Sequence, residues 1–223
     1  MQCWLDRQPA RWLSAGLFFY LMMSNNTTNV FLVRHGQTKW NLFNRIQGQK
    51  NSPLSEVGKK QACRIREKLK DNEIKVAYSS SLGRAVETAA IIIDDLPIKL
   101  IQRDTLNEIA LGPWEGKTFE EAKKMCPVEY EQFWHYPEKY SLSRSETYHE
   151  LQERTVHEIN SIIDKNIGSN VLVVSHGIAI KVILSHFLNL NLSELSEVID
   201  LKNGSYVMIE KKDKTVKIYY GED

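Results

Sequence analysis

The hydrophobic pattern of the chain alternates between short apolar runs and longer amphipathic stretches. Each short run holds a few residues rich in aliphatic and β-branched side chains, which is typical of strands buried in a parallel sheet. The amphipathic stretches between them predict helices that cross from one strand to the next. The predicted strands are Val30–Val33, Ile74–Tyr78, Ile98–Gln102 and Val171–Val174.

Helix starts are predicted from capping residues. Ser55 fits an N-cap with Glu56 in the first turn, and the helix after it has one apolar face, formed by Ala62, Ile65 and Leu69.

Three further helices follow from the same kind of pattern. Thr118-x-x-Glu121 is a capping box, and its helix should end at Pro127. The stretch Tyr148–Ile163 is amphipathic, and the last helix is expected from Gly177 through Leu188.

The tail, Ser205–Tyr220, has two alternating segments around the charged turn Lys211–Lys214, which predicts a hairpin. We expect this hairpin to add an antiparallel edge to the sheet, protected by its lysines. The predicted fold is therefore a three-layer α/β/α sandwich, with a mostly parallel sheet and helices on both faces.

The first 29 residues do not fit this alternation. Trp12–Met23 is an uncharged, mostly apolar run that is shorter than the ~20 residues needed to span a bilayer. A signal peptide over residues 7–23 is the less favoured alternative, because no A-x-A-like cleavage site follows. We expect residues 1–29 to be a poorly ordered leader and linker, with Met22 or Met23 as the true start, and residues 30–223 to form one domain.

Composition narrows the class of protein. The formal net charge of +1 gives no overall attraction to nucleic acid or membrane, so a positive field must come from a few converging arginines. The three cysteines are an odd number without metal-type spacing, which favours a reducing compartment over a disulfide framework. We therefore expect a cytoplasmic protein, monomer or homodimer, without a nucleic-acid partner or a stable membrane association.

Chemically useful side chains follow two of the predicted strands. Arg34-His35-Gly36 follows the first, and Ser175-His176-Gly177 follows the fourth. Because open α/β sheets bind ligands at the carboxyl ends of their strands, the two histidines should converge there. A histidine can attack an electrophile while an arginine holds an oxyanion, so this edge predicts a site for anionic substrates.

Two more segments contribute charged side chains, one an arginine and the other a glutamate. Arg84 lies in the first turn of a helix predicted to open at Leu82, where free amides and the helix dipole favour a phosphate. Glu108 lies in the loop after the third strand, where a carboxylic acid could protonate a poor leaving group. Glu115, the competing carboxylate, is interpreted as structural, holding the turn near Trp114.

These motifs, taken in order, resemble the histidine phosphatase superfamily, also called the phosphoglycerate mutase-like family. The matching patterns are R-H-G-x-T-x-x-N from Arg34, S-x-x-x-R-A-x-x-T-A ending at Ala89, L-x-E-x-x-x-G-x-W-E-G from Leu106, and the final Ser175-His176-Gly177. The resemblance covers about Val30 to Tyr220, and it implies the same sandwich fold.

The resemblance also implies two-step covalent catalysis. Neutral His35 would attack phosphorus, and Arg34, Arg84 and His176 would hold the three non-bridging oxygens. Glu108 would protonate the leaving oxygen and then activate the water that hydrolyses the phosphohistidine. Because Glu108 must be protonated first, activity should favour mildly acid to neutral pH, and a rate flat between about pH 5 and 9 would contradict this role.

The expected substrate contacts extend beyond the catalytic groups. Asn41 is expected to hydrogen-bond the phosphate, Thr38 is a weaker candidate, and the amide of Gly177 is a further donor. The full set of predicted contacts is Arg34, Thr38, Asn41, Arg84, His176 and Gly177. No metal and no cofactor are expected, because side chains supply the positive charge.

Three functions compete at this point. The favoured one is a phosphomonoesterase for small phosphorylated metabolites, similar to the broad-specificity and α-ribazole phosphatases. A cofactor-dependent phosphoglycerate mutase is disfavoured, because such mutases resemble E-R-x-Y-G where this chain has E-I-A-L-G after Leu106-Asn107. A catalytically silent binding protein is disfavoured, because all five catalytic side chains are present.

The segment after Pro127 is rich in aromatic residues. In the family this insertion covers the mouth of the active site, so some of these rings should face the substrate and favour partly apolar esters. The aromatic residues concerned are Tyr130, Phe133, Trp134, Tyr136, Tyr140 and Tyr148.

Overall fold

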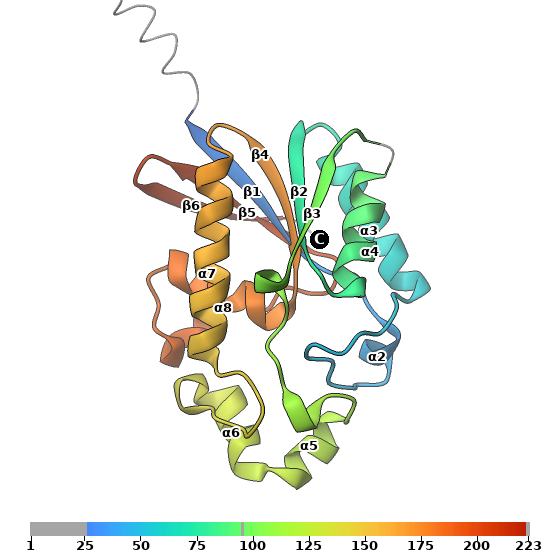
Figure 1. The fold of residues 1–223 in the computed structure, drawn as a ribbon, viewed down its shortest axis with the longest axis vertical. Coiled ribbons are helices and arrows are strands. Elements are labelled where there is room, and N and C mark those ends of the chain that lie inside the picture. Colours follow the sequence, from blue (N-terminus) through green and yellow to red (C-terminus); the bar gives the residue numbers. More distant parts are fainter. Residues whose placement is uncertain (1–25, 95, 222–223) are drawn as a thin grey trace, which may run out of the picture.

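Six strands form one sheet in the order β3-β2-β4-β1-β5-β6 in the computed structural model (Figure 1). The structure describes residues 26–221 except residue 95, so residues 1–25 of the predicted leader and linker (1–29) lie outside the described residues. Strands β1 to β4 run parallel, and β5 and β6 form an antiparallel hairpin beside β1. The bounds are β1 Thr27–Arg34, β2 Ile74–Ser80, β3 Lys99–Arg103, β4 Asn170–Ser175, β5 Tyr206–Lys212 and β6 Thr215–Tyr220.

Helices cover both faces of the sheet, so the predicted three-layer α/β/α sandwich is confirmed (Figure 1). On one face α3 (Glu56–Leu69) and α4 (Gly83–Ile93) pack against a core that includes Phe31 and Val33. On the other face α7 (Tyr148–Lys165) and α8 (Gly177–Phe187) pack against a core that includes Val30 and Leu32. This division follows from the alternation of side chains along a strand.

The predicted helix starts have the expected caps. The Ser55 hydroxyl accepts the amide of Gly58 at the start of α3. Thr118 and Glu121 form the predicted capping box of α5 (Phe119–Met125). Pro127 follows this helix, as predicted, and is also the first residue of α6 (Pro127–His135), where its missing N–H has no intrahelical partner to lose.

The residues between β3 and α7 form a separate layer beyond the carboxyl ends of the parallel strands (Figure 1). We call residues 112–148 the aromatic segment, because its rings pack edge-to-face around Phe133 and Trp114. Besides α5 and α6 it contains the 3₁₀ turns η2 (Gly112–Trp114) and η3 (Pro137–Lys139). The remaining short elements are α2 (Lys39–Leu42), η1 (Asp104–Leu106) and η4 (Leu192–Glu197).

Strand β1 begins earlier than predicted, at Thr27 rather than Val30, so residues 27–29 are not linker. The polar side chains at this end are paired across the sheet. The Thr28 hydroxyl donates to the carbonyl of Asn166, and the Asn29 carboxamide donates to that of Asn170 at 2.9 Å. A hydrophobicity pattern cannot detect a strand whose ends are held by polar pairs.

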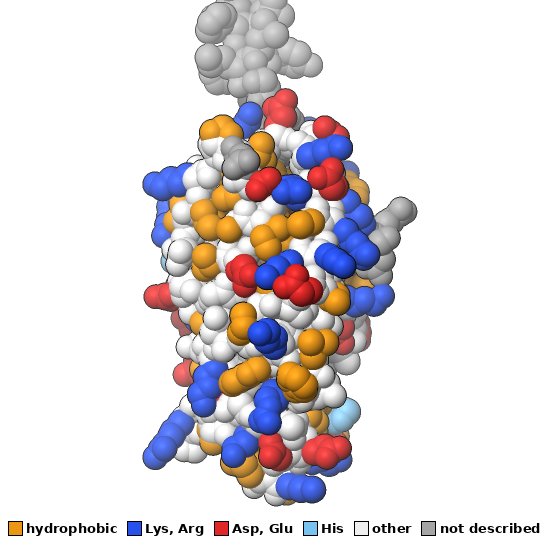
Figure 2. All heavy atoms as spheres, turned by 90° about the vertical axis from the view of Figure 1, so that its right-hand side faces the viewer, with side chains coloured by type: hydrophobic (Ala, Val, Ile, Leu, Met, Phe, Trp, Pro, Cys, Tyr) orange, Lys and Arg blue, Asp and Glu red, His pale blue; other side chains and the backbone are white. Residues whose placement is uncertain are grey.

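Within residues 26–221, residue 95 aside, no helix is long and apolar enough to cross a membrane. Figure 2 looks at the right-hand side of Figure 1 and shows basic, acidic and apolar side chains interspersed on that face. This face therefore carries no extended field of one sign.

Candidate active site

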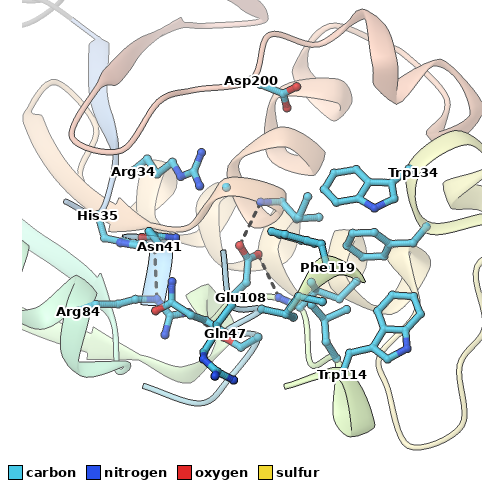
Figure 3. Close-up of a pocket in the computed structure, with 18 of the residues that line it drawn as sticks. Arg34, His35, Asn41, Gln47, Arg84, Glu108, Trp114, Phe119, Trp134 and Asp200 are labelled. Atoms are coloured by element: carbon cyan, nitrogen blue, oxygen red, sulfur yellow. Dashed lines mark hydrogen bonds between the residues drawn. The ribbon is translucent and has the colours of Figure 1, made fainter. Parts of the chain in front are cut away.

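A cavity of about 270 Å³ opens where the carboxyl ends of β1 and β4 meet the aromatic segment (Figures 1 and 3). Arg34 and Ser175 are register partners at these strand ends, so the two histidines follow from adjacent positions. The polar side chains that line the cavity are Arg34, His35, Asn41, Arg45, Gln47, Arg84, Glu108 and Asp200. The aromatic side chains that line it are Trp114, Phe119, Tyr130, Phe133 and Trp134.

His35 presents an unprotonated ring nitrogen to the cavity. Its Nδ1 lies 2.7 Å from the carbonyl oxygen of Gly36, which can only accept, so Nδ1 carries the hydrogen and Nε2 carries the lone pair. Burial, followed by the charges of Arg84 and Arg34, holds the pKa of His35 well below its ordinary value. The imidazole is therefore neutral and nucleophilic at neutral pH.

His176 lies against His35, with the two ring centroids 5.1 Å apart. It is fully buried and contacts the cavity through Arg84, whose Nε donates to its Nδ1 at 3.1 Å. Its Nε2 lies 2.7 Å from the hydroxyl of Ser80 at the end of β2. Burial, followed by the charge of Arg84, lowers the pKa of His176 well below its ordinary value.

Arg84 is held on all sides at the start of α4. Its two terminal nitrogens donate to the carbonyls of Lys50 and Gly48, each at 2.7 Å. Its Nε points at the lone pairs of both histidines, 3.3 Å from Nε2 of His35. Burial lowers its pKa to about 10, so the guanidinium stays charged at neutral pH.

Arg34 supplies a second guanidinium to the cavity. One terminal nitrogen donates to the carbonyl of Leu201, whereas its buried Nε has no partner within the described residues. The backbone of Gly177 runs directly beside this group, since a Cβ there would lie 3.2 Å from Cζ of Arg34. An unpartnered, buried donor next to a helix start is suited to an anionic ligand.

Glu108 lies between the cationic cluster and the aromatic side chains (Figure 3). Its carboxylate accepts the amides of Ile178 and Ala179 at the start of α8, at 3.2 and 3.0 Å, and its own neighbour Ile109 donates at 3.1 Å. The helix start therefore fixes the place of this carboxylate beside the cavity.

Arg154 on α7 holds the loop that carries Glu108, and the sequence analysis did not identify it. It forms a two-pronged ion pair with Glu146, at 2.5 and 2.8 Å. It also donates to the carbonyls of Thr105, Asn107 and Glu108. The guanidinium of Arg154 thereby connects α7 to three residues of the loop that carries Glu108.

Glu115 has the structural role expected for it. Its carboxylate accepts the amides of Gln49 and Leu111 at 2.9 and 3.0 Å, which ties the turn near Trp114 to the loop after α2. Its carboxylate is thus occupied by backbone donors on two sides of the cavity rim.

Asn41 lines the cavity, but Thr38 does not. Thr38 is the fully buried N-cap of α2, and its hydroxyl and amide both donate to Oδ1 of Asn41. The carboxamide oxygen of Asn41 is thus occupied, and its NH₂ group is left to donate into the cavity. The structure places Thr38 as the residue that orients Asn41 rather than as a cavity contact.

Gln47 is a cavity residue that the sequence analysis missed. It is only 8% exposed, and its Oε1 has no hydrogen-bond partner within the described residues. Gln47 lies in a loop without hydrophobic periodicity, so the sequence gave no sign that it is buried.

Phe119 was also missed as a cavity residue, whereas Tyr136, Tyr140 and Tyr148 of the predicted aromatic set do not line the cavity.

The described residues contain no group of three or more His, Cys, Asp or Glu side chains placed to hold a metal ion. The positive charge of the cavity comes from Arg34 and Arg84 near the histidines and from the exposed Arg45 at the rim. Such a cluster can bind a phosphoryl group and stabilise its charge.

An α/β sandwich with two histidines and two arginines at its strand ends, faced by a carboxylate, defines a phosphoryl-transfer enzyme. The chain belongs to the histidine phosphatase superfamily (branch 1), whose family profile matches residues 30–220.

Similar proteins carry both phosphatase and mutase names. A protein of Yersinia pestis (strain Pestoides F), "Probable phosphoglycerate mutase GpmB", is 35% identical over 164 residues, which are 72% of this chain and 75% of that protein. The structure of Bacillus stearothermophilus YhfR has a TM-score of 0.84 at 36% identity, covering 86% of this chain and 96% of that one. A phosphoserine phosphatase mutant from Entamoeba histolytica, in complex with phosphoserine, has a TM-score of 0.75 at 27% identity, with 86% and 94% covered.

Proposed function

We propose that this protein is a metal-independent phosphomonoesterase that hydrolyses small phosphorylated metabolites through a phosphohistidine at His35. The observation that carries the proposal is the lone pair on Nε2 of His35, which faces the cavity and is fixed by the bond from Nδ1 to the Gly36 carbonyl. This nitrogen lies 3.3 Å from Nε of Arg84, so an anionic group drawn to the arginine meets the nucleophile.

In the first step Nε2 of His35 forms a bond to phosphorus while the bond to the leaving oxygen breaks. Arg34, Arg84 and His176 bind the non-bridging oxygens, whose negative charge they stabilise in the transition state. Glu108 gives its proton to the leaving oxygen, which departs as an alcohol.

In the second step Glu108, now a carboxylate, takes a proton from water as the water attacks phosphorus. The N–P bond breaks, inorganic phosphate forms and His35 is restored. The three amides that bind the Glu108 carboxyl group hold it in place beside the cavity in both steps. In this scheme the positive charge that a metal supplies in other phosphatases comes from arginine side chains.

The leaving group lies on the Glu108 side of the cavity, toward the aromatic side chains in Figure 3. Trp134 and Phe119 are both more than a third exposed and line the cavity there. Apolar surface at this position favours substrates whose leaving group is partly apolar. We therefore propose a broad specificity with a preference for such esters.

A phosphoglycerate mutase is the alternative, because a 35% identical relative bears that name. A mutase binds a substrate with a second anionic group, which needs cations on the leaving-group side. Aromatic rings line that side, and the guanidinium of Arg45, the third cation of the cavity, is engaged by the carbonyl of Gly116. These side chains favour hydrolysis over mutase activity.

A catalytically silent binding protein is a less favoured alternative still, because His35, Arg34, Arg84 and Glu108 share one cavity.

A cytoplasmic location is part of the proposal. Cys63 and Cys126 are both free thiols, in keeping with a reducing compartment.

The test is phosphate release from a panel of phosphomonoesters in EDTA, with 3-phosphoglycerate included and its 2-isomer monitored. Release that persists in EDTA and disappears in His35→Ala supports the proposal. Isomer formation without release would make the protein a mutase, and no turnover of any substrate by folded protein would support the binding-protein alternative.

The apolar preference has its own test with a matched pair of variants. Trp134→Ala should raise KM for an aryl phosphate severalfold and leave KM for a small polar ester nearly unchanged. Tyr136→Ala is the control, because this ring is similarly exposed but does not line the cavity. Equal effects of Trp134→Ala on both substrates would remove the ring from substrate recognition.

A further inference from the structure

A chain of hydrogen bonds runs from the backbone of Ser81 to the ring of His176. The carboxamide oxygen of Asn107 accepts the amide of Ser81 at 3.1 Å, which fixes the orientation of that carboxamide. The hydroxyl oxygen of Ser80 lies 2.6 Å from the same Oδ1. Because a carboxamide oxygen only accepts, the single hydroxyl hydrogen of Ser80 is committed to Asn107.

With its hydrogen committed, the Ser80 oxygen can only accept from its other neighbours. It accepts the amide of Leu82 at 3.1 Å, and it lies 2.7 Å from Nε2 of His176. Nε2 must therefore carry a hydrogen, and the lone pair of neutral His176 is on Nδ1. The donation from Nε of Arg84 to that Nδ1, at 3.1 Å, agrees with this assignment.

The two histidines are thus held in opposite tautomers. His35 carries its hydrogen on Nδ1 and His176 carries its hydrogen on Nε2. Their two lone pairs converge on the single Nε–H of Arg84, at 3.3 and 3.1 Å. A lone pair suits a nucleophile, but it repels the oxygen of a bound phosphate.

A phosphoryl oxygen that approaches Nδ1 of His176 therefore needs one hydrogen between the two atoms. That hydrogen lies either on Nδ1, giving an imidazolium and a dianion, or on the phosphate, giving neutral His176 and a monoanion. Both forms contain the same number of protons. We propose that Ser80 and Asn107 are positioning residues that hold His176 as its Nε2–H tautomer and thereby make phosphoryl binding require one extra proton.

The free protein does not hold that proton in advance. The groups facing His176 are the charged side chains of Arg84 from α4, Arg34 from the end of β1 and Arg154 from α7, together with the titratable ring of His35. Together with burial, they lower its pKa well below the ordinary value. At neutral pH and above the proton must arrive with the phosphate or be taken up from solvent.

The first test reads the tautomers in the free protein by ¹⁵N NMR of the histidine rings, so it needs no activity. We expect an Nε2–H signal for His176 and an Nδ1–H signal for His35. Ser79→Ala is the matched control, because Ser79 lies on the same strand and is equally buried, and its hydroxyl has no partner within the described residues. An Nδ1–H tautomer for wild-type His176 would overturn the proposal.

The same spectrum of Asn107→Ala tests the chain itself. Without Asn107 the Ser80 hydroxyl is free to donate to Nε2, so the Nδ1–H tautomer of His176 should gain population. An unchanged spectrum in folded Asn107→Ala would remove Asn107 from the proposed role. If this variant does not fold, the wild-type assignment still decides the proposal.

The second test counts protons by calorimetry of inorganic phosphate binding in buffers of different ionisation enthalpy. At about pH 8.5, where the ligand is a dianion, wild type and Ser79→Ala should each take up about one proton, and Asn107→Ala clearly less. Binding without uptake in wild type would overturn the proposal.

The inference rests on the proposed phosphatase function for its meaning, but the outcomes of the two tests can be told apart. Proton uptake without hydrolysis would refute only the function, and hydrolysis without proton uptake would refute only this inference.

Discussion

At the scale of single residues, Arg84 serves both the fold and the chemistry. Its terminal nitrogens hold the carbonyls of Gly48 and Lys50, and its Nε reaches the lone pairs of His35 and His176. One buried guanidinium therefore closes the loop after α2 and lies where the phosphoryl group is proposed to bind.

Replacing Arg84 separates these two roles. Arg84→Ala should lower kcat by roughly 10²–10³-fold, because charge stabilisation in the transition state is lost. The free energy of unfolding should fall by only about 1–3 kcal/mol, the cost of the unpaired carbonyls, so the protein stays folded. Steady-state kinetics and urea denaturation measure the two effects. Arg66→Ala, which removes an exposed pair with Asp94, is the control, and near-normal turnover by Arg84→Ala would exclude Arg84 from the site.

Replacing Gln47 should affect the stability and the activity of the protein in opposite directions. Among the residues that the structure describes, its buried Oε1 has no partner, which destabilises the free protein. Gln47→Leu should therefore leave the free energy of unfolding equal or higher, while kcat/KM for phosphomonoesters falls about tenfold for the loss of one polar contact. Thermal denaturation and kinetics on one preparation are sufficient. Loss of stability with unchanged kcat/KM would show that the carboxamide serves the fold instead.

From the sequence it was possible to predict which side chains meet at the candidate site, but not the groups that orient them. His35, Arg84 and His176 follow strands or open helices, so local pattern locates them. Ser80 and Arg154 matter through bonds to residues distant in the chain, at separations of 96 for Ser80 to His176 and 46 for Arg154 to Glu108. No local pattern encodes such pairings.

At the scale of elements, the loop between β3 and η2 is clamped from α7. Arg154 and Glu146 are 21% and 13% exposed, and together they fix the backbone around Glu108. The position of Glu108, the proposed general acid, therefore depends on a helix that carries no predicted catalytic residue.

Arg154→Met should destabilise the protein by ~3 kcal/mol, because it leaves a mostly buried carboxylate unpaired. It should also lower kcat about tenfold, since Glu108 loses its support. Arg103→Met is a matched control from a more exposed pair with Glu158 on the same helix, and it should cost under ~1 kcal/mol. Chemical denaturation and single-turnover rates give the comparison; equal costs for the two variants would contradict a special role for Arg154.

Element bounds were predictable where apolar periodicity or a cap marked them. The Ser55 cap, the capping box of α5 and the hairpin are examples, whereas the first residues of β1 and the short helix α2 were not predicted. In both cases polar side chains bond to one another, Asn29 to Asn170 across the sheet and Thr38 to Asn41, and a hydrophobicity pattern does not reveal such bonds.

At the scale of the whole molecule, the two buried histidines link stability to pH. Their folded-state pKa values are lowered by burial and then by Arg84, whereas the unfolded chain titrates near 6.5. Above about pH 7 neither the folded nor the unfolded state binds these protons, so the two histidines do not make the free energy of unfolding depend on pH there. As pH falls below ~6.5 the unfolded state binds them first, and stability decreases until the folded-state values are reached.

Each histidine should contribute a loss of up to about 1.4 kcal/mol per pH unit in this window. Urea denaturation midpoints measured at several pH values between about 7.5 and 5 provide the test. His176→Asn should reduce the slope, and His157→Gln, on the exposed face of α7, should leave it unchanged. A slope indifferent to His176→Asn would mean that other groups dominate the pH dependence.

The position of β1 in the sheet has a consequence for synthesis on the ribosome. Its neighbours are β4 and β5, so Val30 pairs with Val171 and Ile209, and both partner strands are synthesised long after β1. At roughly 5–20 residues per second, the ribosome needs about 10–30 s to reach β4 after it has made β1. During that time an apolar strand with two open edges is exposed on the nascent chain, which makes it a natural client for chaperones that bind emerging polypeptides.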